Sequence, residues 1–367
     1  MLITEPTKTS GLNSDDAESL PGTGQLLRID PSQYAEWDHL LSCHPKSSFF
    51  HTSAWAKVLK ATYGHVPSYF CRFSNGRLQD LLPTVEVARR LTGRRGVSLA
   101  FTDVCEPLRS SSEAGGPLYQ EAMAHGHQRG WRFLECRGNN HDRPGCSPSL
   151  VFYRHVIGLG GNKGKQFDHL DSAVRRAVRK AQKSSVTIEF GNDPESIQAF
   201  YRLHCVTRRR HGVPPQPFRF FENILRYVVL PGHGFVALAR CGKEIVAGGV
   251  FFHHLKQSYY KFGASDSRFQ HLRPNDLLMW DVISRYGTEG YEALDLGRTS
   301  LANQGLRRFK LGFGAREYSI EYFKYDFRKQ SFVRDVDRAQ SWANPLLRRL
   351  PLSWLRLIGQ VVYPHLS

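Results

Sequence analysis

The chain has 367 residues, of which 41% are hydrophobic and 12% aromatic. This length allows two to three domains with a sizeable core, and the composition excludes an intrinsically disordered protein. Fifty Lys and Arg against 33 Asp and Glu leave a formal net charge of +17. Such an excess favours an anionic partner: a nucleic acid, a nucleotide-linked substrate or an anionic membrane face. A basic surface that serves only solubility is the alternative.

The seven cysteines never form a CxxC pair, and the 16 histidines show no metal-ligand spacing. This pattern predicts free thiols in a reducing cytoplasm and no bound metal. No run of 18 or more apolar residues is present, and residues 1–24 lack a basic start followed by an apolar stretch. We therefore expect no membrane span, a flexible polar tail over 1–24, and a cytoplasmic protein, with the inner face of the membrane as an alternative location.

The first half reads as a mixed α/β unit. Apolar residues at helical spacing predict helices over 31–43 and 53–63, and Asn75–Gly76 predicts a hairpin between strands 68–73 and 78–87. A turn is expected at 93–96, followed by a strand at 97–101, a helix near 112–129 and a strand at 131–136. The Gly/Pro-rich stretch 138–148 is typical of a loop.

The second half has a clearer pattern. Strand 150–158, helix 171–183, strand 186–190 and a helix starting at Asp193-Pro194 come first. Strands at 235–239, 244–252 and 258–262, a helix near 274–286, a strand at 291–296, a short helix and a strand at 318–325 follow. No sequence-level repeat relates the two halves.

The stretch Leu294–Gly314, LDLGRTSLANQGLRRFKLGFG, is the strongest candidate for a functional site. Charged and hydroxyl side chains follow the end of an apolar strand, which is where α/β proteins place ligands. The free backbone amides of the following helix start would favour an anion. A plain strand, loop and surface helix is the alternative.

This stretch resembles the C-terminal signature of the FemABX-like branch of the GNAT acyltransferase superfamily. SSFFHTSAWAKVLKATYGHVP near the start, SLAFTDVCEPL at 98–108 and DSAVRRAVRKAQKSSVTIEF at 171–190 agree with it. The resemblance implies an α/β (α+β) fold of two tandem GNAT-like domains with mixed central sheets. We expect an N-terminal domain at 25–149, completed by strands from 316–335, a C-terminal domain at 150–330, and a basic and apolar tail at 335–367.

The resemblance also implies direct attack of an amine on a bound ester or thioester, without a covalent enzyme intermediate. Phe309 and Lys310 match the family's pair at the substrate phosphates and reaction centre, so Lys310 is the first candidate to stabilise developing charge. A solvated helix lysine is the alternative. Asp295 is either a general base or a strand-end hydrogen-bond partner. Asp103, with Glu106 beside it, is a further candidate proton acceptor.

Candidate substrate-binding residues follow from the same resemblance. Arg298 would clamp a phosphate or carboxylate, with an ion pair to Asp295 as the alternative. Arg210, beside Arg208 and Arg209, matches the stretch that reaches the acceptor. The family's tyrosine pair shortly after it is replaced by Phe220–Phe221. The remaining candidates are Tyr259, Tyr260, Lys57 and Lys60.

Two basic segments suggest partners. A candidate polyanion-binding face on helix 171–183 consists of Arg175, Arg176, Arg179, Lys180 and Lys183. The tail Trp342–Ser367 combines leucines, tryptophans and arginines, which suits peripheral membrane contact, although packing onto the protein's own body would explain the same composition.

Three functions remain open at this stage. The first is an acyl- or aminoacyltransferase acting on an amine of a cell-envelope precursor, peptidoglycan or exopolysaccharide. The second is a CoA-dependent N-acetyltransferase acting on a small metabolite or sugar amine. The third is a non-catalytic scaffold that binds anionic glycans. No cofactor is expected to stay bound; the donor would be acyl-CoA or aminoacyl-tRNA, the partners a small-molecule or lipid-linked amine and tRNA, and the protein a monomer.

Overall fold

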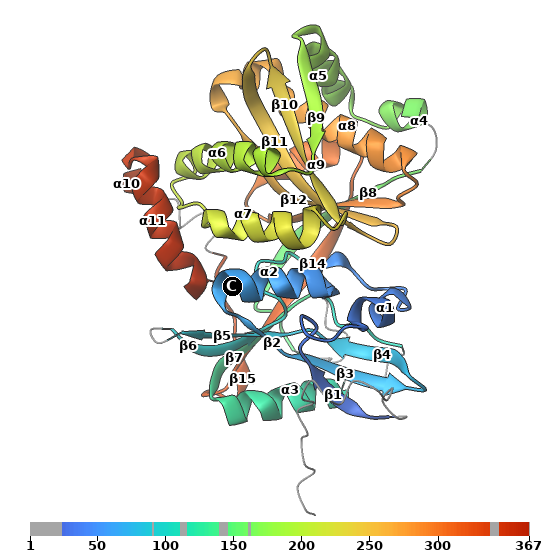
Figure 1. Ribbon diagram of the computed structural model, residues 1–367, viewed down its shortest axis with the longest axis vertical. Coiled ribbons are helices and arrows are strands. Elements are labelled where there is room, and N and C mark those ends of the chain that lie inside the picture. The colour runs from blue at the N-terminus through green and yellow to red at the C-terminus, as the bar shows by residue number, and fades with distance from the viewer. Residues whose placement is uncertain are drawn as a thin grey trace, which may run out of the picture.

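The computed structural model describes residues 24–89, 92–110, 116–138, 146–160, 163–337 and 345–366. The expected flexible tail and most of the loop predicted at 138–148 lie outside these ranges. Two halves are stacked along the long axis of the molecule, with the N-terminal half below in Figure 1 and the C-terminal half above. The helices and strands of the first half are β1 Leu26–Ile29, α1 Trp37–Ser42, α2 Ser53–Tyr63, β2 Val66–Pro67, β3 Tyr69–Ser74, β4 Arg77–Leu82, β5 Val85–Arg89, β6 Gly93–Val97, α3 Gly116–Arg129 and β7 Trp131–Arg137.

Helix α2 and the hairpin β3–β4 confirm the sequence predictions, whereas four others need correction. The first helix begins only at Trp37, because the preceding residues form turns. The strand expected at 78–87 is interrupted between β4 and β5, where Pro83 cannot donate to a ladder. The turn expected at 93–96 is strand β6, and the strand expected at 97–101 ends at Val97. In β6 the backbone pairs with both β5 and β7, and this pairing decides the conformation of a glycine-rich segment.

The C-terminal half contains the predicted helices and strands in the predicted order, with two further helices, α4 Lys163–Asp168 and α7 Phe218–Ile224, that were not predicted. Its elements are β8 Leu150–Gly158, α4 Lys163–Asp168, α5 Ser172–Lys183, β9 Val186–Gly191, α6 Pro194–Arg210, α7 Phe218–Ile224, β10 Gly234–Cys241, β11 Glu244–His254, β12 Gln257–Ser265, α8 Pro274–Thr288, β13 Ala293–Ser300, α9 Gln304–Gly312, β14 Arg316–Asp326 and β15 Ser331–Phe332. The side chain of Asp193 caps α6 by accepting a hydrogen bond from the Ser196 amide, as the Asp-Pro start predicts.

One sheet runs through both halves. Its strand order is β2-β5-β6-β7-β14-β8-β13-β12-β11-β10-β9, with β15 paired to β14. Strand β14 pairs with β7 of the first half and with β8 of the second, so a C-terminal strand completes the N-terminal part of the sheet. Two pairs are parallel, β6 with β7 and β12 with β13, and a helix connects each: α3 in the first half and α8 in the second. The mixed sheet, with one parallel strand–helix–strand unit in each half, agrees with the predicted fold class.

A hydrophobic core joins the two halves. Phe49 packs against Phe252 with 4.6 Å between ring centroids, and Trp55 packs against Phe220 at 6.0 Å. Trp55 and Phe220 are fully buried in the same cluster. Since α2 and α7 lie side by side in the middle of the molecule (Figure 1), the halves form one body with a shared interior. Phe220 and Phe221, at the positions where tyrosines were expected, are core residues.

The C-terminal tail forms two short helices, α10 Pro345–Arg349, which begins at a proline, and α11 Leu352–Val362, which begins directly after Pro351; proline is tolerated at both positions. Leu355 and Tyr363 are buried against the body of the protein, so part of the tail packs onto the chain itself. In the described ranges no helix is both long and apolar enough to cross a bilayer.

Candidate active site

The parallel strands β12 and β13 separate at the centre of the molecule. Their pairing runs from Gln257–Ala293 to Tyr259–Asp295 and then ends. Beyond that point β12 stays paired with β11, while β13 stays paired with β8 across an irregularity between Asp295 and Arg298. The carboxyl ends of two diverging strands present polar backbone edges, a usual position for a ligand in an α/β protein, and this position is called the crevice below.

Asp103 reaches this crevice from the first half. Its carboxylate lies 3.6 Å from the Nε atom of Arg298. It lies so close to Gly297 that a Cβ atom there would come within 2.4 Å of the Asp103 Oδ2 atom. Gly297 also has a φ of 72°, a backbone conformation that residues with a side chain rarely adopt. Both this conformation and the close approach of the Asp103 carboxylate therefore require glycine. The glycine of the LDLGRTS stretch is thereby explained.

The charge on Asp103 is set by two opposing effects. Burial would raise its pKa, but Lys261, Arg298 and Lys310 together lower the pKa below the ordinary value for Asp. Arg298 is held in turn by Tyr322, whose hydroxyl accepts from the Arg298 Nη1 atom at 3.1 Å and itself donates to the Asp103 carbonyl oxygen. Asp103 is therefore an ionised carboxylate among cations, and it can accept hydrogen bonds from an ammonium or amine.

Lys310 is buried, contrary to the alternative of a solvated helix lysine. Its side chain runs from α9 into the crevice, where Nζ donates to the carbonyl oxygens of Gly297 at 2.8 Å and Arg298 at 3.0 Å. Burial lowers its pKa to about 8, against the opposing pull of Asp103 and Asp295. An ammonium group has three N–H donors, so one remains for a substrate oxygen.

Lys261 is a site residue that the sequence analysis missed. It lies on β12 two residues after the last parallel pair, with Nζ 5.2 Å from the centroid of the Phe50 ring and 5.8 Å from that of Trp55. Burial lowers its pKa, while Asp103 acts to raise it. Among the described residues no carboxylate lies within ion-pair distance of its nitrogen. The one available signal was its place on a strand predicted to be central, next to Tyr259 and Tyr260.

Asp295 forms its ion pair with Arg154 and not with Arg298. It pairs with Arg154 of β8 at 2.8 Å, and its other oxygen accepts the Gly297 amide hydrogen at 2.7 Å. The alternative considered for Arg298, an ion pair with Asp295, is not formed, because β13 bends between them and directs Arg298 to Asp103. With both oxygens occupied, Asp295 acts as a strand-end hydrogen-bond partner.

The other candidates lie at varying distances from the crevice. Phe309 packs on Phe313 in the core of the second half. Tyr259 and Tyr260 face opposite sides of β12, and Tyr260 stacks on Phe251. Arg210 ends α6 near Asp266, just beyond β12; its Nη1 atom is buried, without a hydrogen-bond partner in the described structure.

Lys57 and Lys60 are both on α2. Lys57 donates to the Ser53 hydroxyl at 3.3 Å, and Lys60 forms an ion pair with Asp30 at 2.7 Å. The contact of Lys60 fixes the end of β1 to α2, a structural role within the first half. Neither residue was distinguishable from a substrate ligand by sequence.

Helix α5 displays most of its basic residues to solvent. Arg176, Arg179, Lys180 and Lys183 are exposed, whereas Arg175 is half-buried and lies 3.6 Å from Asp168. The helix lies at the far end of the second half (Figure 1). A polyanion-binding face remains a prediction for it.

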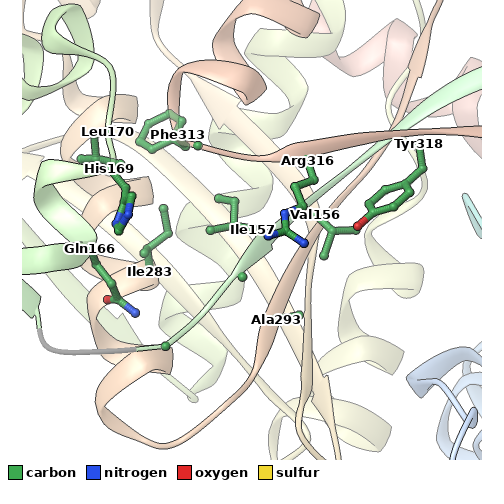
Figure 2. Close-up of a pocket in the computed structure, with 13 residues that line it drawn as sticks. Val156, Ile157, Gln166, His169, Leu170, Ile283, Ala293, Phe313, Arg316 and Tyr318 are labelled. Atoms are coloured by element: carbon green, nitrogen blue, oxygen red, sulfur yellow. The ribbon is translucent and has the colours of Figure 1, made fainter.

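A cavity of about 490 Å³ lies against β8 and is also lined by residues of α4, α8, β13 and β14. Figure 2 shows Gln166, His169 and Leu170 at one side, Arg316 and Tyr318 at the other, and Val156 and Ile157 between them. Val156 is paired across the sheet with Asp295 and with Arg316. The cavity thus reaches the strand position next to Asp295, although the charged groups described above lie outside its lining.

One buried pair has the residue types of a nucleophile and its base. The Sγ atom of Cys105 lies 3.5 Å from the His51 Nε2 atom. Burial raises the pKa of Cys105 well above its usual value and lowers that of His51 to about 4, so neither group is charged. The His51 Nε2 atom also lies 2.9 Å from the Glu106 carbonyl oxygen. This pair holds the Asp103 loop and does not serve as a nucleophile.

Comparison with known proteins decides the class. Residues 170–319 match the acetyltransferase (GNAT) domain family. The second half of this chain therefore matches a GNAT acetyltransferase domain. This range contains Lys261, Asp295, Arg298 and Lys310, while Asp103 comes from the other half.

Solved structures show the same fold over both halves. FemX is 16% identical, with a TM-score of 0.66 over 83% of this chain and 98% of FemX. The C-terminal domain of a putative lysylphosphatidylglycerol synthetase from Agrobacterium fabrum is 14% identical, with a TM-score of 0.52 over 84% and 92%. A tandem GNAT protein from the clavulanic acid biosynthesis pathway is 10% identical, with a TM-score of 0.51 over 82% and 98%. No curated protein sequence matches the chain. The family match confirms the resemblance to the GNAT superfamily and the assignment as an acyltransferase, and the fold shared with FemX agrees with the FemABX-like branch.

Proposed function

We propose that this acyltransferase joins an acyl or aminoacyl group to an amine in the crevice between β12 and β13. The observation that carries the proposal is the meeting of Asp103 from the first half with Lys261, Arg298 and Lys310 from the GNAT domain. Three cations around one carboxylate, at the point where parallel strands separate, supply charge for both proton transfer and an oxyanion. Lys261 is a third cation with no close ion-pair partner among the described residues. A purely structural ion pair between Asp103 and Arg298 would not need it.

The chemistry follows from these groups. The amine nitrogen attacks the carbonyl carbon of the donor, a C–N bond forms, and the carbonyl oxygen becomes an oxyanion. The third N–H of Lys310 is suited to bind that oxyanion. Asp103 accepts a hydrogen bond from the attacking amine and takes the proton that the nitrogen loses. Collapse of the intermediate breaks the carbon–sulfur or carbon–oxygen bond, and the leaving group departs with the returned proton.

The donor is an activated acyl group, either acyl-CoA or aminoacyl-tRNA. The match to the GNAT family favours acyl-CoA, and the basic surface favours a tRNA. The cavity of Figure 2 offers space for the end of the donor, since Val156 in its lining is paired with Asp295. Substituting Ala293, which also lines the cavity, by Phe would fill that space and raise KM for the donor more than for the acceptor.

The acceptor is proposed to be an amine on a phosphate-bearing cell-envelope precursor. The net charge of +17 and the cations of the crevice favour an anionic acceptor. Similarity in fold to FemX and to a lysylphosphatidylglycerol synthetase domain supports the same class. A small metabolite or sugar amine is the second candidate, favoured by the GNAT family match alone.

Product formation followed by mass spectrometry tests the proposal. The purified protein would be incubated with acetyl-CoA, longer acyl-CoAs or charged tRNA, each with UDP-MurNAc-pentapeptide or with simple amines. We expect one donor to give an acylated amine and Asp103→Asn to abolish it, while Asp168→Asn, an exposed carboxylate on α4, retains activity. Binding of anionic glycans without any acyl transfer from any donor would instead support a non-catalytic scaffold.

A further inference from the structure

The C-terminal helix α11 has two different faces. Its inner face is fixed to the body of the protein: Leu355 is buried, and a Cβ atom at Gly359 would come within 2.0 Å of the Pro215 carbonyl oxygen. Just after the helix, the Tyr363 hydroxyl donates to the Pro214 carbonyl oxygen at 3.1 Å and accepts from Arg208 at 2.7 Å. These contacts hold α11 against the end of α6 and the segment after it, at the side of the molecule (Figure 1).

The outer face of α11 is apolar and exposed. Trp354 is 61% exposed, Leu357 56% and Val361 69%. Their spacing of three and four residues places them in one stripe along the helix, opposite the buried Leu355. Tryptophan together with aliphatic side chains is the composition that proteins use at the boundary between headgroups and acyl chains.

Positive charge accompanies the stripe. Residues 345–367 contain three arginines and no Asp or Glu. Arg356 is exposed on the side of α11 that faces α6, with its guanidinium carbon 5.5 Å from the centroid of the Tyr201 ring, and Arg348 lies near His211 at the end of α6. Basic side chains in the same segment as an apolar stripe add electrostatic attraction to anionic lipid, about 1 kcal/mol for each cation near the surface.

We propose that the outer stripe of α11, Trp354, Leu357 and Val361, docks the protein on an anionic lipid bilayer. The helix lies in the plane of the membrane, because 11 residues span only about 16 Å and cannot cross it. The inner contacts keep the helix attached to the body, so the whole protein is held at the surface. This inference rests on α11 and is independent of the acyl transfer proposed above.

A second copy of the chain is the competing occupant of this face. Pairing two copies through α11 would bring the arginines of both copies together. A single short helix would also bury far less than the roughly 1,200 Å² of a stable protein interface. Both the charge and the small area therefore favour a lipid surface over a dimer.

Co-sedimentation with vesicles tests the inference. One set of vesicles contains phosphatidylglycerol and phosphatidylcholine in equal amounts, and the other contains phosphatidylcholine alone. We expect the full-length protein to bind the anionic vesicles, with binding weakened by salt. Replacing Trp354, Leu357 and Val361 together by Ser should lower the partition coefficient about tenfold or more, through loss of apolar burial.

The chain offers a matched control. Val66, Leu230 and Leu255 are exposed apolar residues outside α11, with exposures of 49%, 60% and 48%. Their triple Ser variant should bind vesicles like the unmodified protein, and thermal unfolding of both variants verifies that each is folded. Equal vesicle binding by the α11 variant, or no binding by the unmodified protein, overturns the inference. A dimer in sedimentation velocity that the α11 variant converts to a monomer would assign the face to a second copy instead.

Discussion

The two halves use the same supersecondary unit differently. Units β6–α3–β7 and β12–α8–β13 each contain two parallel strands, and in each the last paired residue of the second strand is acidic: Glu135 in the first half, Asp295 in the second. An arginine follows shortly in both, and Arg137 and Arg298 lie over the same Tyr322 ring, at 5.6 and 5.4 Å from its centroid. The duplication absent from the sequence is visible in this topology.

The units differ in what lies beyond the paired strands. In the first half, the segment directly after β6 occupies the position beyond the paired strands. The Ser98 hydroxyl accepts a hydrogen bond from the Arg137 amide at 2.6 Å, and the Arg137 side chain donates to the Thr102 carbonyl oxygen at 3.0 Å. In the second half the strands part and leave the crevice. The loop that closes the first unit continues to Asp103, which enters the second. The β6–α3–β7 unit therefore supports the site, and the β12–α8–β13 unit contains it.

Loss of the Asp103 charge should have the largest effect on activity. Asp103→Asn keeps the size of the side chain but removes the proton acceptor, so kcat is expected to fall by about 10²–10⁴-fold. Steady-state rates with the true donor and acceptor measure this. Glu106→Gln, three residues further along the same loop, is the control and should retain most activity. Equal losses in the two variants would show that the loop, not the carboxylate, matters.

Lys310→Met tests the cation that faces Asp103 at the β12–α8–β13 unit. Loss of its charge should lower kcat by about 10²–10³-fold, as for removal of an oxyanion donor. Because the Lys310 pKa is lowered to about 8, its ammonium form is present below that pH and is lost as the pH rises through it. The rate of the unmodified enzyme should decline above about pH 8. A variant with the same high-pH decline as the parent would contradict the assigned role.

Lys261 is expected to contribute less. Since it faces Asp103 without a close ion pair, it is suited to attract an anionic part of the substrate. Lys261→Met should raise KM about tenfold, equivalent to roughly 1.4 kcal/mol, and change kcat little. The exposed Lys256→Met, in the turn before β12, provides the control. A loss confined to kcat would move Lys261 from binding to the chemical step.

A substitution in the β6–α3–β7 unit should lower the stability of the protein more than its activity. Ser98→Ala leaves the buried Arg137 amide without its acceptor, at a cost of about 1–3 kcal/mol in the free energy of unfolding. Denaturant unfolding measures this change, and kcat should change far less than in Asp103→Asn. Should Ser98→Ala instead leave stability unchanged and abolish turnover, the contrast between a supporting and a reacting unit would fail.

Much of the architecture follows from local sequence. The Asp193-Pro194 start, the amphipathic pattern of 171–183 and the alternation of the strands fix most elements of the second half, because each pattern acts within a few residues. The LDLGRTS and Phe309–Lys310 motifs likewise indicate where the site lies along the chain. Segments such as Gly93–Gly96 were misread, since their conformation depends on strands that pair with them from elsewhere.

The sequence by itself determined the class of protein, the order of elements in the GNAT domain and the importance of the stretch 294–314. Tertiary structure alone decided the partners of the charges. Asp103 and Arg298 are far apart in the chain, and Arg298 turns to Asp103 and away from Asp295 only because β13 bends where it leaves β12. The tertiary structure also buries Lys310 and places Lys261 at the site. Pairing across distant segments depends on strand register and burial, which no local pattern of residues encodes.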